Sequence, residues 1–293
     1  MANMTFPLTG TGIWSAALRY SEPAVAGDLA AELEGLGYAA LWIPDVGGDL
    51  FGPLENLLTA TTTATIATGI LNLWMHEPDE TAAQHARLSS SYGRRLLVGI
   101  GVSHAPLIDR EEPGRYRKPL ARTREFLDGL DGASTPLPAD DRVLAALGPK
   151  MLDLARDRAA GTHPYLVTPE HTAAARHAVG PGKLVLPEQG VVLETDPDRA
   201  RMIARGHLAT YLGLPNYSNN WKRFGFTDDD LGDGGSDRLV DSLVAWGDEA
   251  AIAARVQEHR DAGADHVCLQ VLAEDPGALP IEDCRRLAAA VNA

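Results

Sequence analysis

Short apolar runs alternate with longer stretches of helical periodicity along most of the chain. Residues 38–43 and 96–102 are apolar almost throughout. Strands without polar alternation are typical of a parallel sheet that is covered on both faces. In the stretch that Pro23 opens and Gly37 ends, leucines recur at helical intervals. The pattern therefore predicts repeated strand–helix units.

About eight such units can be placed on the chain. The expected strands cover residues 12–16, 38–43, 66–74, 96–102, 142–147, 165–167, 183–192 and 266–271. The expected helices cover residues 23–36, 53–63, 79–92, 149–160, 197–212, 249–262 and 281–291, with another that begins at Pro169 after the cap residue Thr168. This arithmetic predicts an α/β fold, a (β/α)8 TIM barrel. A doubly wound sheet is the alternative.

A single domain is expected over residues 1–293, because no linker rich in Pro, Gly or Ser divides the chain. Residues 214–247 interrupt the rhythm with many Gly, Asn and Asp residues, among which Trp221, Phe224 and Phe226 are interspersed. We expect an inserted loop or helical region there, before the last units. It would serve either as a lid over a substrate or as an interaction surface.

Composition and charge narrow the classes of function. The chain has 40 acidic and 26 basic residues, a net charge of −14, which argues against a nucleic-acid partner. Two cysteines are too few for a disulfide framework, and no metal site is expected. The first residues lack a charged region followed by an apolar run, and no apolar stretch is long enough for a membrane span. A cytoplasmic protein is expected.

In such a barrel, function lies at the carboxyl ends of the strands. Three of the expected strand ends carry polar side chains, Asp45, Asn72 and His104. Each has a plainer explanation: an Asp often caps a turn, an Asn bonds a neighbouring strand, and a lone His is usually structural. Gly99 and Gly101 would allow a flat ligand or another backbone to approach closely.

Taken in order, five runs of sequence resemble the luciferase-like flavin and deazaflavin oxidoreductase family. They are GIW at 12–14, LGYAALWIPD at 36–45, ATGILNLWMHEP at 67–78, RRLLVGIGVSHAP at 94–106 and GTHPYLVTPEHTAAAR at 161–176. The branch that the chain most resembles uses coenzyme F-420, a deazaflavin that moves hydride. FMN is the alternative cofactor.

The resemblance implies roles at the ends of strands two to four. It places Asp45 near the edge of the deazaflavin. It also implies a bulge in strand three, often with a non-prolyl cis peptide, that supports the ring near Leu71 and Asn72. At the end of strand four, Gly101 and Ser103 are expected beside the cofactor.

The resemblance further assigns the cofactor's phosphate to the helix start after strand six. Free N–H groups and the helix dipole attract a phosphodiester at such a position. Pro169 has no N–H group, so Glu170, His171 and Thr172 would have to donate, next to Thr168. The Glu170 carboxylate would need to point away from the phosphate.

One departure from the family changes the mechanism. Some members follow the strand-two Asp with a catalytic His, whereas this chain has Val46. We therefore expect hydride transfer between the deazaflavin and a small organic substrate with a different proton donor. The catalytic candidates are His104, Asp45 and His76, and the substrate-binding candidates are Trp14, Trp74 and Tyr116, the last also a possible proton donor.

Two other functions remain open from the sequence. One is an FMN-dependent monooxygenase that uses O2 and receives reduced flavin from a separate reductase. The other is a barrel without cofactor that acts as a binding partner. Small residues on the helices expected at 53–63 and 79–92 suit either a homodimer face or simple packing on the barrel.

Overall fold

The strands of the computed structural model are short and mostly buried. The structure describes residues 6–275 and 277–292. The strands are β1 (Gly10–Trp14), β2 (Ala40–Ile43), β3 (Thr65–Thr68), β4 (Leu71–Asn72), β5 (Leu96–Gly101), β6 (Arg142–Leu144), β7 (Gly161–Thr162), β8 (Leu184–Val185), β9 (Glu188–Val192), β10 (Val244–Trp246) and β11 (His266–Val271). The start of the chain at residues 1–5, on which part of the leader-segment prediction rests, lies outside the described residues.

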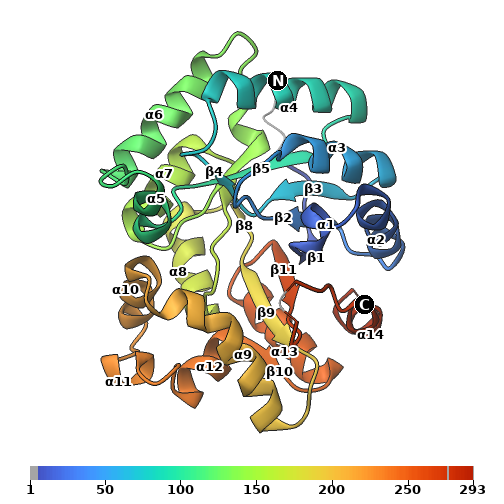
Figure 1. Cartoon of the computed structure of the whole chain (residues 1–293), viewed down its shortest axis with the longest axis vertical. Helices are drawn as coiled ribbons and strands as arrows, with labels where there is room; N and C mark the ends of the chain where they lie inside the picture. The colour runs from blue at the N-terminus through green and yellow to red at the C-terminus, as the bar shows by residue number, and fades with distance from the viewer. Residues whose placement is uncertain (1–5, 276, 293) are drawn as a thin grey trace.

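Helices follow nearly every strand, as the periodicity predicts (Figure 1). They are α1 (Ala17–Tyr20), α2 (Pro23–Gly35), α3 (Phe51–Ala60), α4 (Pro78–Tyr92), α5 (Ala105–Glu111), α6 (Pro119–Gly132), α7 (Pro149–Arg158), α8 (Pro169–Val179), α9 (Pro197–Leu212), α10 (Pro215–Arg223), α11 (Asp228–Leu231), α12 (Asp237–Leu243), α13 (Glu249–Asp261) and α14 (Ile281–Val291). Pro occupies the first turn of most of them, where its missing N–H costs nothing.

The strands pair in parallel and curl into a barrel. Hydrogen-bonded neighbours follow the order β10-β9-β11-β1-β2-β3-β5-β6-β7-β8, with β4 beside β5. Between β8 and β9 lie only Leu186 and Pro187, so residues 184–192 form one stretch of chain that joins β7 to β11. At the join the Glu188 amide donates to Pro164 on the β7 side, and the Cys268 amide donates to Pro187 on the β11 side, both at 2.9 Å. The predicted parallel α/β fold with a curled, barrel-like sheet is confirmed, and successive strands lie side by side rather than in a doubly wound order.

The barrel interior is filled by side chains. Trp42 is fully buried there and stacks on His163 with ring centroids 4.2 Å apart. Phe6 and Leu8 are buried in the same cluster as Trp42. Since the interior is a packed core, a ligand has room only at the outer end of the strands.

The third predicted strand, residues 66–74, is broken in two. The break between β3 and β4 contains a cis peptide bond, Gly69–Ile70, two residues before the position near Leu71 and Asn72 that the resemblance implied. A Cβ atom on Gly99 would lie 2.1 Å from the Thr68 carbonyl oxygen, and one on Gly101 would lie 2.6 Å from the Ile70 side chain. These glycines were expected to admit either a flat ligand or another backbone. At Gly99 the neighbour is another backbone.

The sixth strand was placed wrongly by the sequence. Residues 165–167 form a loop, and β7 lies earlier, at Gly161–Thr162. Leu166 has a φ of 52°, a left-handed conformation that is unfavourable for a residue with a Cβ atom. The apolar run resembled a strand because Leu166 is buried by tertiary contacts and not by strand pairing.

Residues 214–247 fold into α10, α11, α12 and β10. Figure 1 shows these helices with α9 at one end of the molecule, opposite α4 and α6. Trp221 and Phe226 are buried there in an apolar cluster that also includes Leu208 and Leu239. The region is therefore mainly helical, and its status as an insertion stays a prediction.

Among the described residues, none of the helices combines the length and apolarity needed to cross a bilayer. In the same part of the chain, no group of three or more His, Cys, Asp or Glu side chains is placed to hold a metal ion.

Candidate active site at the barrel mouth

Asp45, after β2, is fully occupied by partners within the protein. One carboxylate oxygen accepts from Arg19 at 2.9 Å, and the other accepts from the Asn72 amide at 3.0 Å and lies 2.7 Å from Nε2 of His76. Burial alone would raise its pKa, but the hydrogen bonds from His76, Asn72 and Arg19 outweigh burial and lower it. Asp45 thus holds β4, just after the break in strand three. Direct contact of Asp45 with a cofactor stays a prediction.

Arg19 was not anticipated from the sequence. Its guanidinium is buried and binds the Pro44 carbonyl, the Asp45 carboxylate and the carbonyl of Gly47, the last at 2.8 Å. An arginine at the first turn after β1 thereby ties the loop after β2 in place. Nothing in the local sequence signals this role, because the partners lie about 25 residues away in the chain.

His104 begins α5 at the end of β5 and lies half-buried at the mouth. Its ring is 5.3 Å from that of Tyr217, and its Nδ1 is 3.4 Å from the Asn216 amide nitrogen. Burial lowers the pKa of His104 to about 4. At neutral pH the imidazole is therefore uncharged, so it suits accepting a proton and not the proton-donor role expected from its ordinary pKa.

Aromatic rings cross the mouth from β1 to β5. Trp14 lies 6.1 Å from Tyr165, Tyr165 lies 6.3 Å from Tyr217, and Tyr217 lies 5.3 Å from His104. Two predicted site residues, Trp14 and His104, thus stand at opposite ends of one aromatic row. Tyr165 and Tyr217 were not predicted as site residues.

The other two predicted substrate residues lie beyond His104 on the β4–β5 side. Trp74 and Tyr116 lie 5.7 Å apart, and the Trp74 indole donates to the Val102 carbonyl at 2.7 Å. The Tyr116 hydroxyl is 3.5 Å from the carbonyl oxygen of Ser103, a residue with a φ of 54°. The structure therefore separates Trp74 and Tyr116 from Trp14.

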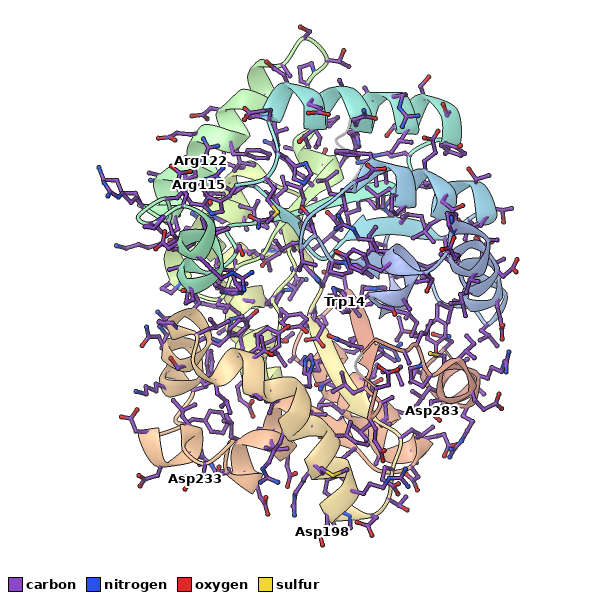
Figure 2. All side chains as sticks on the ribbon, viewed as in Figure 1. Trp14, Arg115, Arg122, Asp198, Asp233 and Asp283 are labelled. Carbon is purple, nitrogen blue, oxygen red and sulfur yellow. The ribbon has the colours of Figure 1, made fainter. Side chains whose placement is uncertain are left out.

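A basic edge borders this side of the mouth, consisting of Arg115 and Arg122. Arg115 donates to the Trp74 carbonyl at 2.6 Å, and the Arg122 guanidinium lies over the Trp74 ring at 5.7 Å. Figure 2 shows both arginines on the same side of the molecule, with Trp14 near the middle. Their ion pairs with Glu112 and Glu125 are long, 3.6 and 3.8 Å.

The helix start after β7 fits a phosphate poorly. The Thr172 amide already donates to the Thr168 carbonyl at 3.1 Å, so it is not the free donor that was predicted. Hydrogen bonds from the Thr168 hydroxyl and from its own backbone amide lower the pKa of Glu170. A carboxylate therefore covers the N-terminus of α8, where phosphate was expected.

His171 and Thr172 point into the fold. His171 is 1% exposed and bonds the Leu147 carbonyl at 3.1 Å, and the Thr172 hydroxyl lies 2.8 Å from Nδ1 of His259. Burial, only partly offset by the bond to Leu147, lowers the pKa of His171 to about 4. Their side chains hold α8 against the barrel.

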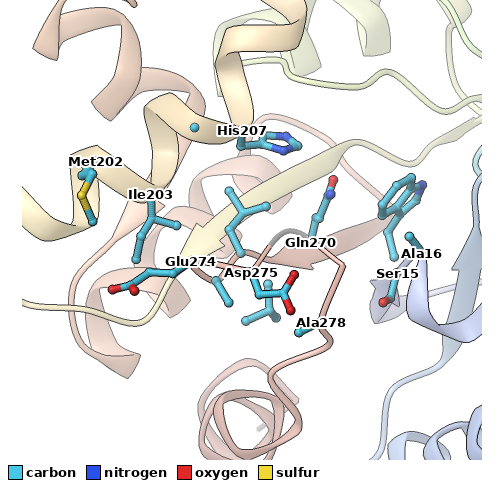
Figure 3. A pocket seen from close by; sticks show the side chains of 14 residues that line it. Ser15, Ala16, Met202, Ile203, His207, Gln270, Glu274, Asp275 and Ala278 are labelled. Atoms are coloured by element: carbon cyan, nitrogen blue, oxygen red, sulfur yellow. The ribbon is translucent and has the colours of Figure 1, made fainter. Parts of the chain in front are cut away.

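A cavity of about 340 Å³ lies between the ends of β1 and β11 and one side of α9. Trp14 lines it, and Figure 3 shows His207 of α9 and Gln270 of β11 at one side, with Glu274 and Asp275 at the other. This volume is at the small end of the range for ligand pockets. Of the predicted substrate residues, Trp14 lines this cavity.

Tyr165 joins the cavity to the aromatic row. Its hydroxyl donates to the side-chain oxygen Oε1 of Gln270 at 2.7 Å and lies 3.3 Å from Nε2 of His207 and 3.2 Å from the Tyr211 hydroxyl. Burial lowers the pKa of His207 to about 4, so this hydrogen-bonding group is uncharged at neutral pH. Such groups can orient an alcohol or carbonyl oxygen.

Glu188, at the start of β9, is fully buried behind this network. One of its oxygens accepts from the Leu166 amide at 3.0 Å, and the other has no hydrogen-bond partner among the described residues. Burial raises the pKa of Glu188 to about 8, against the opposing effect of the Leu166 bond. Glu188 therefore helps to hold the left-handed loop that presents Tyr165.

Comparison with known proteins decides the family. The family model described as luciferase-like monooxygenase matches residues 6–266. The chain belongs to this family. The resemblance read from the sequence is therefore confirmed, and with it the assignment to a family of oxidoreductases.

Three matches show where the chain stands among its relatives. A Mycobacterium tuberculosis protein provisionally named as a coenzyme F-420-dependent oxidoreductase is 29% identical over 118 residues, which are 40% of this chain and 33% of that protein. This alignment thus spans about a third of the relative. In the F-420-dependent tetrahydromethanopterin reductase of Methanopyrus kandleri the TM-score is 0.75, at 18% identity over 97% of this chain and 98% of that chain.

A flavin-binding member of the same fold also matches. The FMN complex of the oxygenating constituent of 3,6-diketocamphane monooxygenase from Pseudomonas putida has a TM-score of 0.66, with 13% identity over 97% of this chain and 98% of that chain. At such identities the two solved structures show the barrel fold alone.

Proposed function

We propose that this protein is an oxidoreductase that binds coenzyme F-420 at the barrel mouth and exchanges hydride with a small organic substrate. When bound, the deazaflavin supplies the carbon that takes or gives the hydride. The observation that carries the proposal is the row of aromatic rings from Trp14 to His104 across the mouth of a luciferase-like barrel.

Residues at the break between β3 and β4 fit the flat ring. Gly69 and Ile70 are partly exposed, although the strands on either side of them are buried. The Trp14 indole donates to the Gly69 carbonyl at 2.7 Å, and a Cβ atom on Gly69 would lie 2.8 Å from that indole. A bare backbone beside an aromatic wall is a suitable support for a planar heterocycle.

The basic edge is the better place for the anionic tail of the cofactor. Arg115 and Arg122 lie beside Trp74, whereas the N-terminus of α8 carries the Glu170 carboxylate. Guanidinium groups bind phosphate and carboxylate through paired hydrogen bonds. We therefore assign the tail to the Arg115–Arg122 side of the mouth.

His104 would act as the proton acceptor when an alcohol is oxidised. It is neutral at pH 7, and Asn216 and Tyr217 hold its ring. Proton transfer to a positioned base contributes about 10²–10⁴-fold to the rate. His76, which lies against Asp45, orients the loop after β4 in this proposal and does not move the proton.

A cofactor titration tests the proposal. Purified protein is titrated with F-420 and with FMN, and quenching of tryptophan fluorescence is followed in each case. We expect F-420 to bind at least about tenfold more tightly, a difference of about 1.4 kcal/mol. Tighter binding of FMN would instead favour the monooxygenase alternative, and binding of neither would favour the barrel without cofactor.

The homodimer stays part of the proposal. Ala82 on α4 is buried in the main core, whereas Ser89 of the same helix is only partly covered. The small residues of α3 and α4 thus serve packing in part. Sedimentation of the purified protein would show whether the remaining surface joins two copies.

A further inference from the structure

The two sides of the barrel mouth carry different charged side chains. Arg115 and Arg122 border the β4–β5 side, and Glu274 and Asp275 line the cavity at the ends of β1 and β11. No lysine or arginine is among the described residues that line the cavity. The Glu274 carboxylate pairs at 3.0 Å with Arg199, which does not itself line the cavity. Asp275 accepts from the Gly277 amide at 3.0 Å.

The inner end of the cavity offers neutral hydrogen-bonding groups. Gln270 and His207 both lie within hydrogen-bond distance of the Tyr165 hydroxyl. The walls between the two ends are largely apolar and include Trp14, as well as Ile203, which Figure 3 shows. The cavity thus presents an apolar body, a neutral polar inner end and an acidic outer end.

We infer that this cavity is the substrate compartment and that it selects compact, uncharged or cationic alcohols and carbonyl compounds against anionic ones. The inference rests on the proposed function for the statement that the occupant is a substrate. A ligand oxygen binds against His207 and Gln270, and the rest of the molecule lies along Trp14 and Ile203. A carboxylate or phosphate on the ligand would face Glu274 and Asp275, and the like charge disfavours its binding relative to a neutral group.

The same charge distribution keeps substrate and cofactor tail apart. The anionic tail is drawn to Arg115 and Arg122, and the carboxylates at the β11 end repel it. The cavity therefore remains open for a second molecule when the ring lies at the mouth. This separation is a property of this chain's own side chains.

Three aromatic alcohols of similar size test the charge selection. Benzyl alcohol, 4-(aminomethyl)benzyl alcohol and 4-(hydroxymethyl)benzoate are titrated against the cofactor-free protein, and dissociation constants are measured by ligand-observed NMR. We expect the benzoate to bind at least about tenfold more weakly than benzyl alcohol, and the amine to bind as tightly or more tightly.

Variants assign the selection to the cavity. The double change Glu274→Gln and Asp275→Asn should reduce the difference between benzoate and benzyl alcohol to less than about threefold. Asp233→Asn, which removes an exposed carboxylate after α11 that does not line the cavity, should leave the difference unchanged (Figure 2). Ile203→Trp, which fills the cavity, should abolish binding of all three compounds.

Equal binding of benzoate and benzyl alcohol to the unaltered protein would overturn the inference. So would absence of binding by all three compounds, or binding that Ile203→Trp does not affect. Because these measurements use no cofactor, they are independent of the F-420 titration. Failure to bind F-420 with charge selection intact would refute the proposed function alone, and F-420 binding without charge selection would refute this inference alone.

Discussion

At the scale of single residues, the charge states of the mouth follow from burial. His104 and His207 lose water without gaining an anionic partner, so both remain neutral at pH 7. Asp45 is also buried, but three hydrogen bonds keep it ionised. The sequence identifies such residues by type and position, but their protonation depends on neighbours that only the fold brings together.

His104→Ala should lower the turnover of alcohol oxidation by about 10²-fold or more while the affinity for F-420 stays nearly unchanged, since the side chain accepts a proton and does not hold the ring. In the unaltered protein, kcat/KM should fall as the pH drops through about 4, because the protonated imidazole cannot accept a proton. Steady-state kinetics between pH 3.5 and 8 measure both effects.

A matched control is His177→Ala, since His177 is exposed on α8 away from the mouth. This variant should retain the turnover and the pH profile of the unaltered protein. Unchanged turnover in His104→Ala would remove His104 from the mechanism.

Glu188 should make the fold less stable as the pH rises. Its pKa is raised from 4.5 to about 8 in the folded protein, so the native state binds the proton more tightly than the unfolded chain does. Its contribution is therefore complete below about pH 4.5 and is lost as the pH rises through about 8. Melting temperatures between pH 5 and 9 should fall less steeply in Glu188→Gln than in the unaltered protein.

Glu34 provides the opposite case for comparison. Despite partial burial, hydrogen bonds from the amides of Thr63, Ala64 and Thr62 lower its pKa to about 2. Its contribution is present above about pH 4.5 and is lost as the pH falls through about 2. Glu34→Gln should therefore leave the slope between pH 5 and 9 unchanged, and a steeper slope in Glu188→Gln would contradict the assignment.

At the scale of elements, periodicity predicted most helices and strands, and close packing explains the failures. The helices α9 and α14 match their predicted bounds. The third strand breaks where Gly99 and Gly101 admit the Thr68 carbonyl and the Ile70 side chain from the neighbouring strand. The loop at residues 165–167 is as apolar as a strand, but it pairs with no strand. Its Leu166 backbone is bonded instead by the side chains of Glu188 and Trp221. Neither contact has a local sequence signal.

Gly99→Ala should destabilise the protein by more than about 2 kcal/mol, since the added Cβ atom would lie 2.1 Å from a backbone oxygen that cannot move alone. Denaturant unfolding measures the change. Gly35→Ala, in α2, is the matched control, because its Cβ atom would enter open space. It should stabilise the protein by about 0.5–1 kcal/mol. Equal effects of the two changes would show that strands β3 and β5 are not so closely packed.

At the scale of the whole molecule, the barrel and its family could be predicted, but the arrangement of charge at its mouth could not. A net charge of −14 opposes an anionic cofactor at long range, and the basic edge attracts it at short range. The phosphate position expected from the sequence, at α8, fits poorly because the side chain of Glu170 bonds the Thr168 hydroxyl and its own amide there. The orientation of the Glu170 carboxylate has no signal in the local sequence.

Raising the ionic strength from about 10 mM to about 150 mM should therefore tighten the binding of F-420. The Debye length falls from about 30 Å to about 8 Å, so the distant negative charges are screened more than Arg115 and Arg122. Fluorescence titrations at both salt concentrations measure the effect.

The double variant Arg115→Ala and Arg122→Ala should bind F-420 more weakly at both ionic strengths. Arg156→Ala serves as the control, because this arginine lies on α7 and pairs with Asp153 and Asp157. If both sets of variants bound the cofactor alike, the assignment of the tail to the basic edge would be wrong.

The helices α9, α10 and α12 have an apolar cluster of their own, distinct from the one that joins the barrel to its outer helices. This segment contributes one wall of the cavity, and the ends of β1 and β11 contribute the rest. Because α10 of the same segment supplies Asn216 and Tyr217 to the ring of His104, any change in how the segment packs would alter the cavity wall and the aromatic row together.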